Sequence, residues 1–547
     1  MGKKCYCNLV AATRHRSRMI MLFALSLLIG LGGISSFASN KDLSSPAVGR
    51  SQTPPVVKAP SGTYIGIATE TGRRFLGIRY AQSPVGPLRW AAPQAVHEGH
   101  TPYKAQEFGS VCVQPVNRQI INPRRGEPMK GSEDCLFLNV YGPARTADPR
   151  PVMVWIHGGA FVNGAGSDYD PHILAEKQNV IVVTINYRLG ALGFLSHPAL
   201  GAESGGYGLL DQQAALRWVR RNIASFGGDP ARVTIFGESA GGVSVCALLR
   251  SPGAKGLFSR AIIESGPCVA FDRKLADQKG IAYAKAASCP ENGPAAIACL
   301  RRLDAVSAGS TSGMTEVGVG GTPWTLVQGT AVLPGTGAML DAGQFSRVPV
   351  LNGSNLDEGR LFALGGLGRL HNEADYLHDL KVQHGERGAK IAAFYPVSGY
   401  PSVALAFSAY LTDWLFACPA LSANTAMSRY TPVYAYEFRD RNAPTGLQAP
   451  AELGTLGAFH SAEVQYVFQT PDQLGPARFT PEQQRVADRI QQAWATFARD
   501  GVPTISGEPA WVPVSAGNPA IRNLGTSGMT YVADFAPHHH CDFWARW

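Results

Sequence analysis

The sequence has no internal repeat, no long low-complexity run and no stripe of basic residues interleaved with aromatic ones. The last absence argues against nucleic-acid binding, which needs a cationic face and rings on which bases stack. Charged residues make up only 16% of the chain and hydrophobic residues 45%, as is typical of a globular protein with a large core. The 61 glycines and 38 prolines are scattered, which predicts many loops rather than disorder.

Long apolar runs are also scarce, and the one that stands out lies at residues 19–31. Five basic and no acidic residues accompany it, and Ser36-Phe37-Ala38 supplies small residues at positions −3 and −1 for cleavage. We expect residues 1–38 to be a secretory signal peptide, with an uncleaved anchor as the alternative, and residues 39–61 to be a loose lead-in. Loss of the leader lowers the net charge from +9 to +4. The protein is then secreted or periplasmic, with no membrane span after cleavage.

Metal-binding patterns are missing too. The chain contains no C-x-x-C pair and no paired Cys/His cluster, which argues against a zinc site. His538–His540 is a run of three histidines, but consecutive side chains diverge, so we do not expect a metal there. Two of the ten cysteines fall in the leader, and an exported chain can oxidise the other eight. Spacing alone does not assign their pairs.

Apolar strands alternate with helical stretches over residues 135–270. Strands are expected at Val152–Ile156, Val180–Ile185 and Val233–Phe236, and a helix over Asp211–Val219. This alternation predicts an α/β fold with a largely parallel sheet. Further expected elements are a hairpin of Tyr64–Ala68 with Phe75–Tyr80, strands at 348–352 and 432–438, mostly helical structure over 365–428, and a helix capped by Thr480 and stopped by Gly501.

The most informative segment is Gly237-Glu238-Ser239-Ala240-Gly241-Gly242. It follows the expected strand Val233–Phe236 and precedes an apolar stretch that continues as a helix. Strand, tight turn and helix is the context in which a nucleophilic serine is exposed on a strained turn, flanked by glycines because side chains there would collide. The segment therefore predicts that Ser239 is a nucleophile.

A second glycine-rich turn follows the apolar strand that ends at Ile156 and reads His157-Gly158-Gly159-Ala160-Phe161. Acyl transfer passes through a tetrahedral oxyanion, which needs preorganised N–H donors. Small residues allow backbone amides to approach that oxygen. Together with the serine turn, this segment is the expected oxyanion loop.

A serine nucleophile needs a base and an acid. In hydrolases whose serine lies on a turn between a strand and a helix, these residues follow along the chain in the order serine, acid, histidine. Asp357 and Glu358 both follow a strand, and spacing does not choose between them. Thirteen histidines compete for the role of base. We expect three of them to lie at the surface because their surroundings are polar: His371, His378 and His384.

From about residue 62 to the C-terminus the sequence resembles the type-B carboxylesterases, which include cholinesterases and bacterial para-nitrobenzyl-type esterases. The resemblance rests on the serine turn and on Tyr80-Ala81, Pro84–Trp90, Ser132–Leu136, Asn186–Arg188, Gly208–Gln212 and Phe226–Pro230. It implies one α/β-hydrolase domain over residues 62–547, with a large, mostly parallel central sheet flanked by helices and with helical insertions over the active site.

The resemblance also implies the site and the reaction. Glu358 is selected over Asp357, for which a solvated or turn-forming role is expected, and His460 becomes the base. The implied residues are the catalytic Ser239, Glu358 and His460, the oxyanion N–H groups of Gly159, Ala160 and Ala240, and Glu238, Ser265 and Glu463 around the histidine. A small-molecule ester would be hydrolysed through an acyl-enzyme without a cofactor. The alternatives are a lipase or amidase on the same fold, and a non-catalytic binding ectodomain.

Disulfides and ion pairs follow from the same resemblance. The implied disulfides are Cys112–Cys135, Cys289–Cys299 and Cys418–Cys541, with Cys246 and Cys268 free. The implied buried ion pairs are Arg89–Glu133 and Arg188–Asp229.

The sequence departs from the cholinesterases in one segment. Residues 113–134 contain no Trp, Tyr or Phe, and recognition of choline by cation–π contact needs an aromatic face there. The glycine-rich stretch Gly318–Thr322 falls where the family shapes its acyl pocket. We therefore expect neutral esters with a tolerant acyl side rather than choline esters.

Overall fold

The computed structural model describes residues 53–96, 101–117, 128–144, 148–310, 324–335, 337–366, 370–471, 475 and 478–547. They belong to a single compact unit that spans Gln52–Trp547. The expected signal peptide, 1–38, lies outside the described residues. The lead-in is not loose throughout, because β1 (Val56–Ala59) pairs antiparallel with β2 (Gly62–Ile65).

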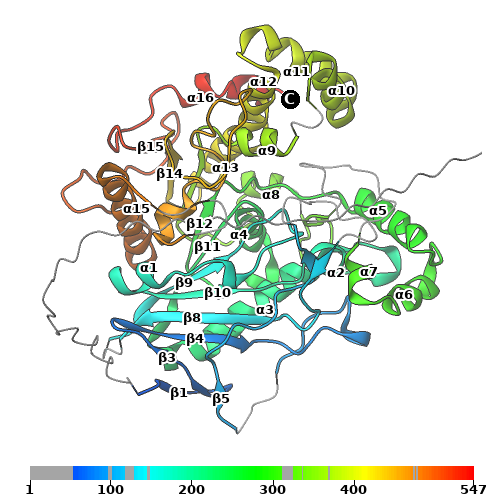
Figure 1. Cartoon of the computed structure of the whole chain (residues 1–547), viewed down its shortest axis with the longest axis vertical. Coiled ribbons are helices and arrows are strands. Elements are labelled where there is room, and N and C mark those ends of the chain that lie inside the picture. The colour runs from blue at the N-terminus through cyan, green and yellow to red at the C-terminus, as the bar shows by residue number, and fades with distance from the viewer. Residues whose placement is uncertain are drawn as a thin grey trace, which may run out of the picture. The chain divides into compact units, whose positions relative to one another are not determined.

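A ten-stranded sheet forms the centre of the described chain (Figure 1), in the order β15-β14-β13-β12-β11-β9-β10-β8-β4-β3. All pairs from β15 to β10 are parallel, and the pairs that β8, β4 and β3 make are antiparallel. The bounds are β3 Ile67–Ala68, β4 Gly72–Arg79, β8 Phe137–Pro143, β9 Arg150–Ile156, β10 Ile181–Ile185, β11 Gly228–Glu238, β12 Arg260–Glu264, β13 Val350–Asn355, β14 Val433–Phe438 and β15 Ile521–Leu524. The expected α/β fold with a mostly parallel sheet is confirmed.

The central strands are buried on both faces. Successive side chains of β9 point to opposite sides, so that Val154 joins one hydrophobic cluster and Trp155 the other. A strand covered on both faces becomes a continuous apolar run, which is why residues 152–156 are recognisable in the sequence.

Helices cover both faces of this sheet. Residues of α3 (Tyr207–Asn222) and α4 (Ala240–Arg250) pack in the first cluster, and residues of α1 (His172–Lys177) and α15 (Pro481–Asp500) pack in the second. The helix α15 begins with the expected capping box between Thr480 and Gln483 and ends at Gly501, whose φ of +78° closes the last turn. Its stripe of Val486, Ile490, Trp494 and Phe497 is buried in the core, as its spacing predicts.

Two further helical groups extend beyond the two layers in Figure 1, one formed by α5–α7 and one by α9–α12. The remaining helices are α2 Gly190–Phe194, α5 Arg273–Ala286, α6 Gly293–Arg301, α7 Ala305–Gly309, α8 Ala338–Asp341, α9 Gly359–Gly366, α10 Glu373–His384, α11 Gly388–Phe394, α12 Val403–Leu411, the π-helical η9 Thr412–Ala417, α13 Cys418–Ser428, α14 Val464–Phe468, α16 Phe535–His538 and α17 Cys541–Trp544. The expectation of mostly helical structure over 365–428 is confirmed.

One sequence expectation about organisation is wrong. The segment Tyr64–Ala68 is not one strand, because β2 joins a small separate sheet and only β3 pairs with β4. Among the described residues, one continuous helical segment, Val403–Ser428, is long and apolar enough to cross a membrane by length and composition alone. Most of this segment is buried inside the fold, and a buried core helix meets the same criteria of length and composition.

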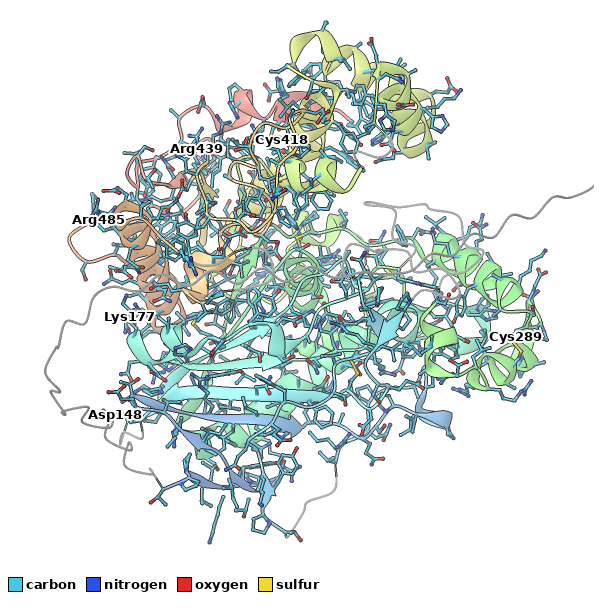
Figure 2. The ribbon with its side chains drawn as sticks, viewed as in Figure 1. Asp148, Lys177, Cys289, Cys418, Arg439 and Arg485 are labelled. Atoms are coloured by element: carbon cyan, nitrogen blue, oxygen red, sulfur yellow. A yellow bond between two sulfur atoms is a disulfide. The ribbon has the colours of Figure 1, made fainter. Side chains whose placement is uncertain are left out.

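Four disulfides are present among the described residues. Three are the pairs that the resemblance implied, namely Cys112–Cys135, Cys289–Cys299 and Cys418–Cys541. Figure 2 marks Cys289, which lies between α5 and α6, and Cys418, which is the first residue of α13. The fourth, Cys246–Cys268, contradicts the expectation of two free thiols. It joins α4 to the loop after β12, two segments that the contact between Gly242 and Gly266 already brings together.

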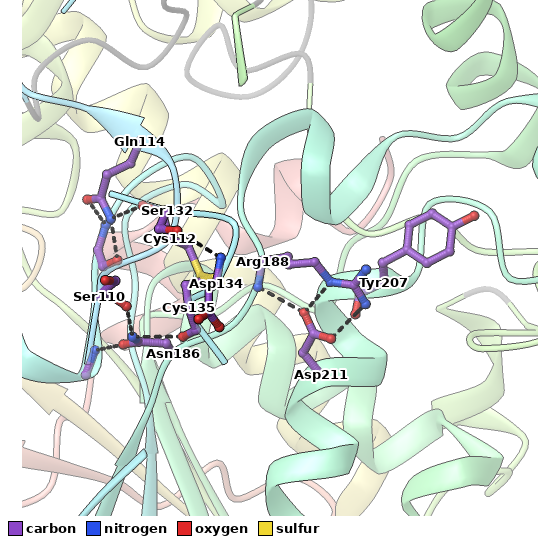
Figure 3. Close-up of a disulfide and its surroundings, with 12 residues drawn as sticks. Ser110, Cys112, Gln114, Ser132, Asp134, Cys135, Asn186, Arg188, Tyr207 and Asp211 are labelled. Atoms are coloured by element: carbon purple, nitrogen blue, oxygen red, sulfur yellow. Dashed lines mark hydrogen bonds and ion pairs between the residues drawn. A yellow bond between two sulfur atoms is a disulfide. The ribbon is translucent and has the colours of Figure 1, made fainter. Parts of the chain in front are cut away.

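One of the two implied ion pairs is correct. Arg89 and Glu133 form a buried bidentate pair, with both N–O distances at 2.6 Å. Arg188 does not pair with Asp229. It binds Asp211 of α3 through Nε and Nη2, at 2.7 and 2.8 Å, close to the Cys112–Cys135 disulfide (Figure 3). Asp229 is more exposed and pairs with Arg232, three residues along the chain.

Candidate active site

The predicted functional residues gather at one edge of the sheet. The parallel strands β9, β11, β12 and β13 run in the same direction, so the residues that follow them emerge together. Ligand sites of open α/β sheets lie at this carboxyl edge. The segments involved are His157–Gly159 after β9, Ser239 after β11, Ser265 after β12 and Glu358 after β13.

Ser239 occupies the strained turn that the sequence predicts. Its φ of +56° and ψ of −124° are rare for a residue with a side chain. A Cβ at Gly241 would lie 1.9 Å from the carbonyl oxygen of Ile156, and one at Gly237 would lie 2.5 Å from it. The flanking glycines thus allow the turn to pack tightly onto β9. The N–H of Ser239 donates to the carbonyl of Glu264 at 2.9 Å, which fixes the turn against β12.

His460 is held by the carboxylate of Glu358. Its Nδ1 lies 2.6 Å from Oε2 of Glu358, and both side chains are buried. The other oxygen of Glu358 accepts the backbone N–H of Asn355 at 2.7 Å, so the carboxylate itself is fixed. Rings of Phe362 and Phe416 lie 5.0 and 4.8 Å from the imidazole. This arrangement orients the imidazole and leaves Nε2 as the nitrogen available for chemistry.

The Nε2 side of His460 faces Glu238. Nε2 lies 3.1 Å from Oε1 of Glu238, off the line of a hydrogen bond. Within the described residues Nε2 makes no hydrogen bond, and hence none to Ser239 Oγ. Such contacts often tighten only when substrate is bound. Burial by itself lowers the pKa of His460, but the Glu238 and Glu358 carboxylates outweigh it and raise the pKa above its usual value.

The turn after β9 places several amides at the same edge. Gly159 and Ala160 have φ values of +97° and +52°. A Cβ at Gly159 would lie 2.2 Å from the carbonyl oxygen of Asn163, so only glycine fits. The ring of Tyr187 stacks on His157 at 4.3 Å and its hydroxyl donates to the His157 carbonyl, which holds the base of the turn. Ala240, the first residue of α4, has an N–H without an acceptor inside the helix.

Further buried carboxyl groups surround the histidine. Glu463 accepts hydrogen bonds from Asn355 Nδ2 and, at 3.5 Å, from Ser265 Oγ. Burial, and then the nearby carboxylates led by Glu238, raise the pKa of Glu463 well above its usual range. Glu264, which the sequence did not single out, is fully buried, and burial raises its pKa to about 8. It accepts a hydrogen bond from Trp494 Nε1 at 2.9 Å. An acidic residue ending the apolar run of β12 was the signal available in the sequence.

Other candidate residues lie elsewhere. Asp357 is not solvated, because it is buried and pairs with Arg360 and Arg441. His371 and His378 are exposed as expected, whereas His384 is half-buried, with Nε2 2.5 Å from the hydroxyl of Tyr410.

The histidine run and the acyl-pocket stretch were also candidates. His539 is buried between Asp413 and Glu437, at 2.8 and 2.6 Å, and these partners raise its pKa to about 9 against the effect of burial. Gly318–Thr322 lies outside the described residues.

Comparison with known proteins decides the family. The model of the "Carboxylesterase family" matches residues 53–544. The chain belongs to the carboxylesterase family. Membership makes it a carboxylic ester hydrolase, as the resemblance implied.

Relatives of this carboxylesterase include bacterial and animal enzymes. The para-nitrobenzyl esterase of Bacillus subtilis (strain 168) is 37% identical over 452 residues, which cover 80% of this chain and 88% of that enzyme. The acetylcholinesterase of Bungarus fasciatus is 32% identical over 508 residues, covering 86% and 82%. A solved PNB esterase structure superposes with a TM-score of 0.74 at 34% identity, covering 88% of this chain and 98% of that structure. The expected α/β-hydrolase fold is thereby confirmed.

Proposed function

We propose that the protein is a secreted serine carboxylesterase that uses Ser239, His460 and Glu358 and forms an acyl-enzyme. The observation that carries the proposal is the 2.6 Å contact between Glu358 and His460 at the sheet edge where the strained turn presents Ser239. A fixed acid–imidazole pair at the same sheet edge as a half-buried serine on a tight turn is an arrangement that can activate a hydroxyl.

In the first half of the reaction Ser239 Oγ attacks the carbonyl carbon of the ester. Nε2 of His460 takes the hydroxyl proton, and Glu358 stabilises the resulting imidazolium through Nδ1. The tetrahedral intermediate then collapses, and the imidazolium gives its proton to the departing alcohol. In the second half water attacks the acyl-enzyme with His460 again acting as base, and the acid is released.

We assign the oxyanion donors to the backbone N–H groups of Gly159, Ala160 and Ala240. The close packing of the Gly159 turn against Asn163 supports this assignment, because it fixes the amides before substrate arrives. The N-terminus of α4 adds the partial positive charge of a helix start at Ala240. We assign Glu238, Ser265 and Glu463 to the buried surroundings of His460, without contact to substrate.

Neutral esters are the proposed substrates. The absence of aromatic residues from 113–134 supports this choice, since a quaternary ammonium group has no ring to meet there. Secretion is supported by the four disulfides of the described chain, which form and persist in oxidising compartments. The apolar run at 19–31 supports an export signal.

A serine-reactive phosphonate and para-nitrophenyl butyrate test the proposal together. We expect stoichiometric labelling of the wild-type protein at Ser239 and loss of nearly all turnover in Ser239→Ala. Ser259→Ala is the matched control. Ser259 precedes β12, at the end of that strand away from the candidate site, and its hydroxyl donates to the carbonyl of Val233. A Ser239→Ala protein that keeps more than about a hundredth of wild-type kcat/KM contradicts the assignment. Absence of labelling together with no turnover of any ester or amide would favour the non-catalytic alternative.

A further inference from the structure

Ser461 follows the proposed base directly and has an unusual backbone. Its φ of +73° lies in the left-handed region, which residues with a Cβ adopt rarely. Non-glycine residues remain in that region when their surroundings hold them there, often at functional sites. The contacts of its side chain show what the hydroxyl does.

The hydroxyl of Ser461 donates a hydrogen bond to Oε1 of Glu238. The same oxygen lies 3.1 Å from Nε2 of His460. One carboxylate oxygen thus faces both a hydroxyl and the nitrogen that must accept the proton of Ser239. Glu238 is 3% exposed, so bulk water does not screen these contacts.

The two protonation states of His460 make different demands on Glu238. When Nε2 carries a proton, it faces the carboxylate favourably. When Nε2 is neutral, its lone pair faces a negatively charged acceptor, and that oxygen then needs another donor. The hydroxyl of Ser461 is a donor already in place.

We propose that Ser461 is a positioning residue for the esterase reaction, whose hydroxyl holds Oε1 of Glu238 and so favours the unprotonated, base form of His460. The inference rests on the proposed function of His460. It assigns to Ser461 no contact with substrate.

The effect has a definite sign. Without the hydroxyl, the charge on Glu238 is less well satisfied and attracts a proton on Nε2 more strongly, so the pKa of His460 rises. Glu238 faces the imidazole from the end of β11 and Glu358 from the turn after β13, and the rings of Phe362 of α9 and Phe416 of η9 lie against it. Two more buried carboxyl groups act on these carboxylates at longer range, Glu264 and Glu463.

The test compares Ser461→Ala and Ser461→Gly with wild type in the pH dependence of kcat/KM for para-nitrophenyl butyrate. Both variants lose the hydroxyl, but alanine keeps the Cβ at a positive φ whereas glycine removes that strain. In both variants we expect the midpoint of the rise in kcat/KM with pH, here called the rising limb, to move to a higher pH by about half to one unit. The plateau of kcat/KM at high pH should stay within about twofold of wild type. Activity below the limb then falls by about three- to tenfold.

A background variant separates positioning from simple structural support. In Glu238→Gln the neutral amide removes the charge through which Ser461 acts, so adding Ser461→Ala should shift the limb no further. An unshifted limb in both single variants would overturn the inference. So would an equal loss of activity at every pH, or a shift confined to one of the two variants.

Direct titration of the His460 imidazole by NMR, with labelled histidine and His460→Gln for assignment, makes the result independent of turnover. An upward shift in Ser461→Ala without any esterase activity would refute the proposed function and leave the Ser461–Glu238–His460 linkage standing. An unshifted titration in a protein that the phosphonate still labels would refute the inference and leave the proposed function standing.

Discussion

Removal of the Asp211 carboxylate should be among the most destabilising single changes outside the sheet. Asp211 is fully buried and Arg188 is 3% exposed. The carboxylate accepts three hydrogen bonds from Arg188, from the backbone N–H at 3.0 Å, from Nε at 2.7 Å and from Nη2 at 2.8 Å. Asp211→Ala leaves a guanidinium buried without its counter-ion.

The expected cost of Asp211→Ala is about 3–5 kcal/mol, the range for stranding one member of a buried ion pair. Burial raises the pKa of Asp211, with Arg188 opposing the shift, so desolvation of the carboxylate offsets part of what the pair gains. The pair is therefore costly to break but contributes less than that figure to net stability. Asp229→Ala is the control, because its pair with Arg232 is partly exposed and should contribute under about 1 kcal/mol.

The assay is urea unfolding of the oxidised protein, followed by tryptophan fluorescence, with the midpoints of both variants compared with wild type. Asp211→Ala should unfold at clearly lower urea or fail to be secreted, whereas Asp229→Ala should unfold near the wild-type midpoint. Equal midpoints for the two variants, or a larger loss in Asp229→Ala, would refute the reasoning about burial.

Three other predictions follow from the site and the disulfides. The rising limb of kcat/KM should lie above pH 6.5, because the neighbouring carboxylates favour the protonated form of His460, and Glu238→Gln should move it down; an upward move would contradict this. Replacement of both Cys246 and Cys268 by serine should lower stability by about 3 kcal/mol in the chain-entropy model, measured as a lower melting temperature; non-reducing peptide maps that show two free thiols would exclude the bond. Butyrylcholine should have a kcat/KM no higher than its uncharged isostere, since cation–π contacts of about 0.5–2 kcal/mol are missing from 113–134; a preference for the cation would show that another aromatic lines the pocket.

Local patterns carried much of the fold. The strands before Ser239 and Gly159 are apolar because both faces of the sheet are covered, and Thr480, Gln483 and Gly501 mark the ends of α15 by capping chemistry. The family resemblance then assigned the motif segments, from Tyr80-Ala81 to Phe226–Pro230, to positions in this fold.

What the sequence did not give was mostly long-range pairing. Arg188 binds Asp211, which is 23 residues away on α3, and nothing in the spacing favours it over Asp229. The Cys246–Cys268 bond depends on how α4 packs against the loop after β12. Glu264 escaped notice because its role depends on neighbours that come from distant strands and helices.

The most direct test of the account is the intact mass of the protein quenched in acid during turnover of para-nitrophenyl butyrate. We predict a population heavier by one butyryl group, with the added mass on the peptide that contains Ser239 and absent from Ser239→Ala. Turnover at the wild-type rate with the acyl group on a residue other than Ser239 would contradict the proposed nucleophile. So would the absence of any acylated protein under conditions where deacylation limits the rate.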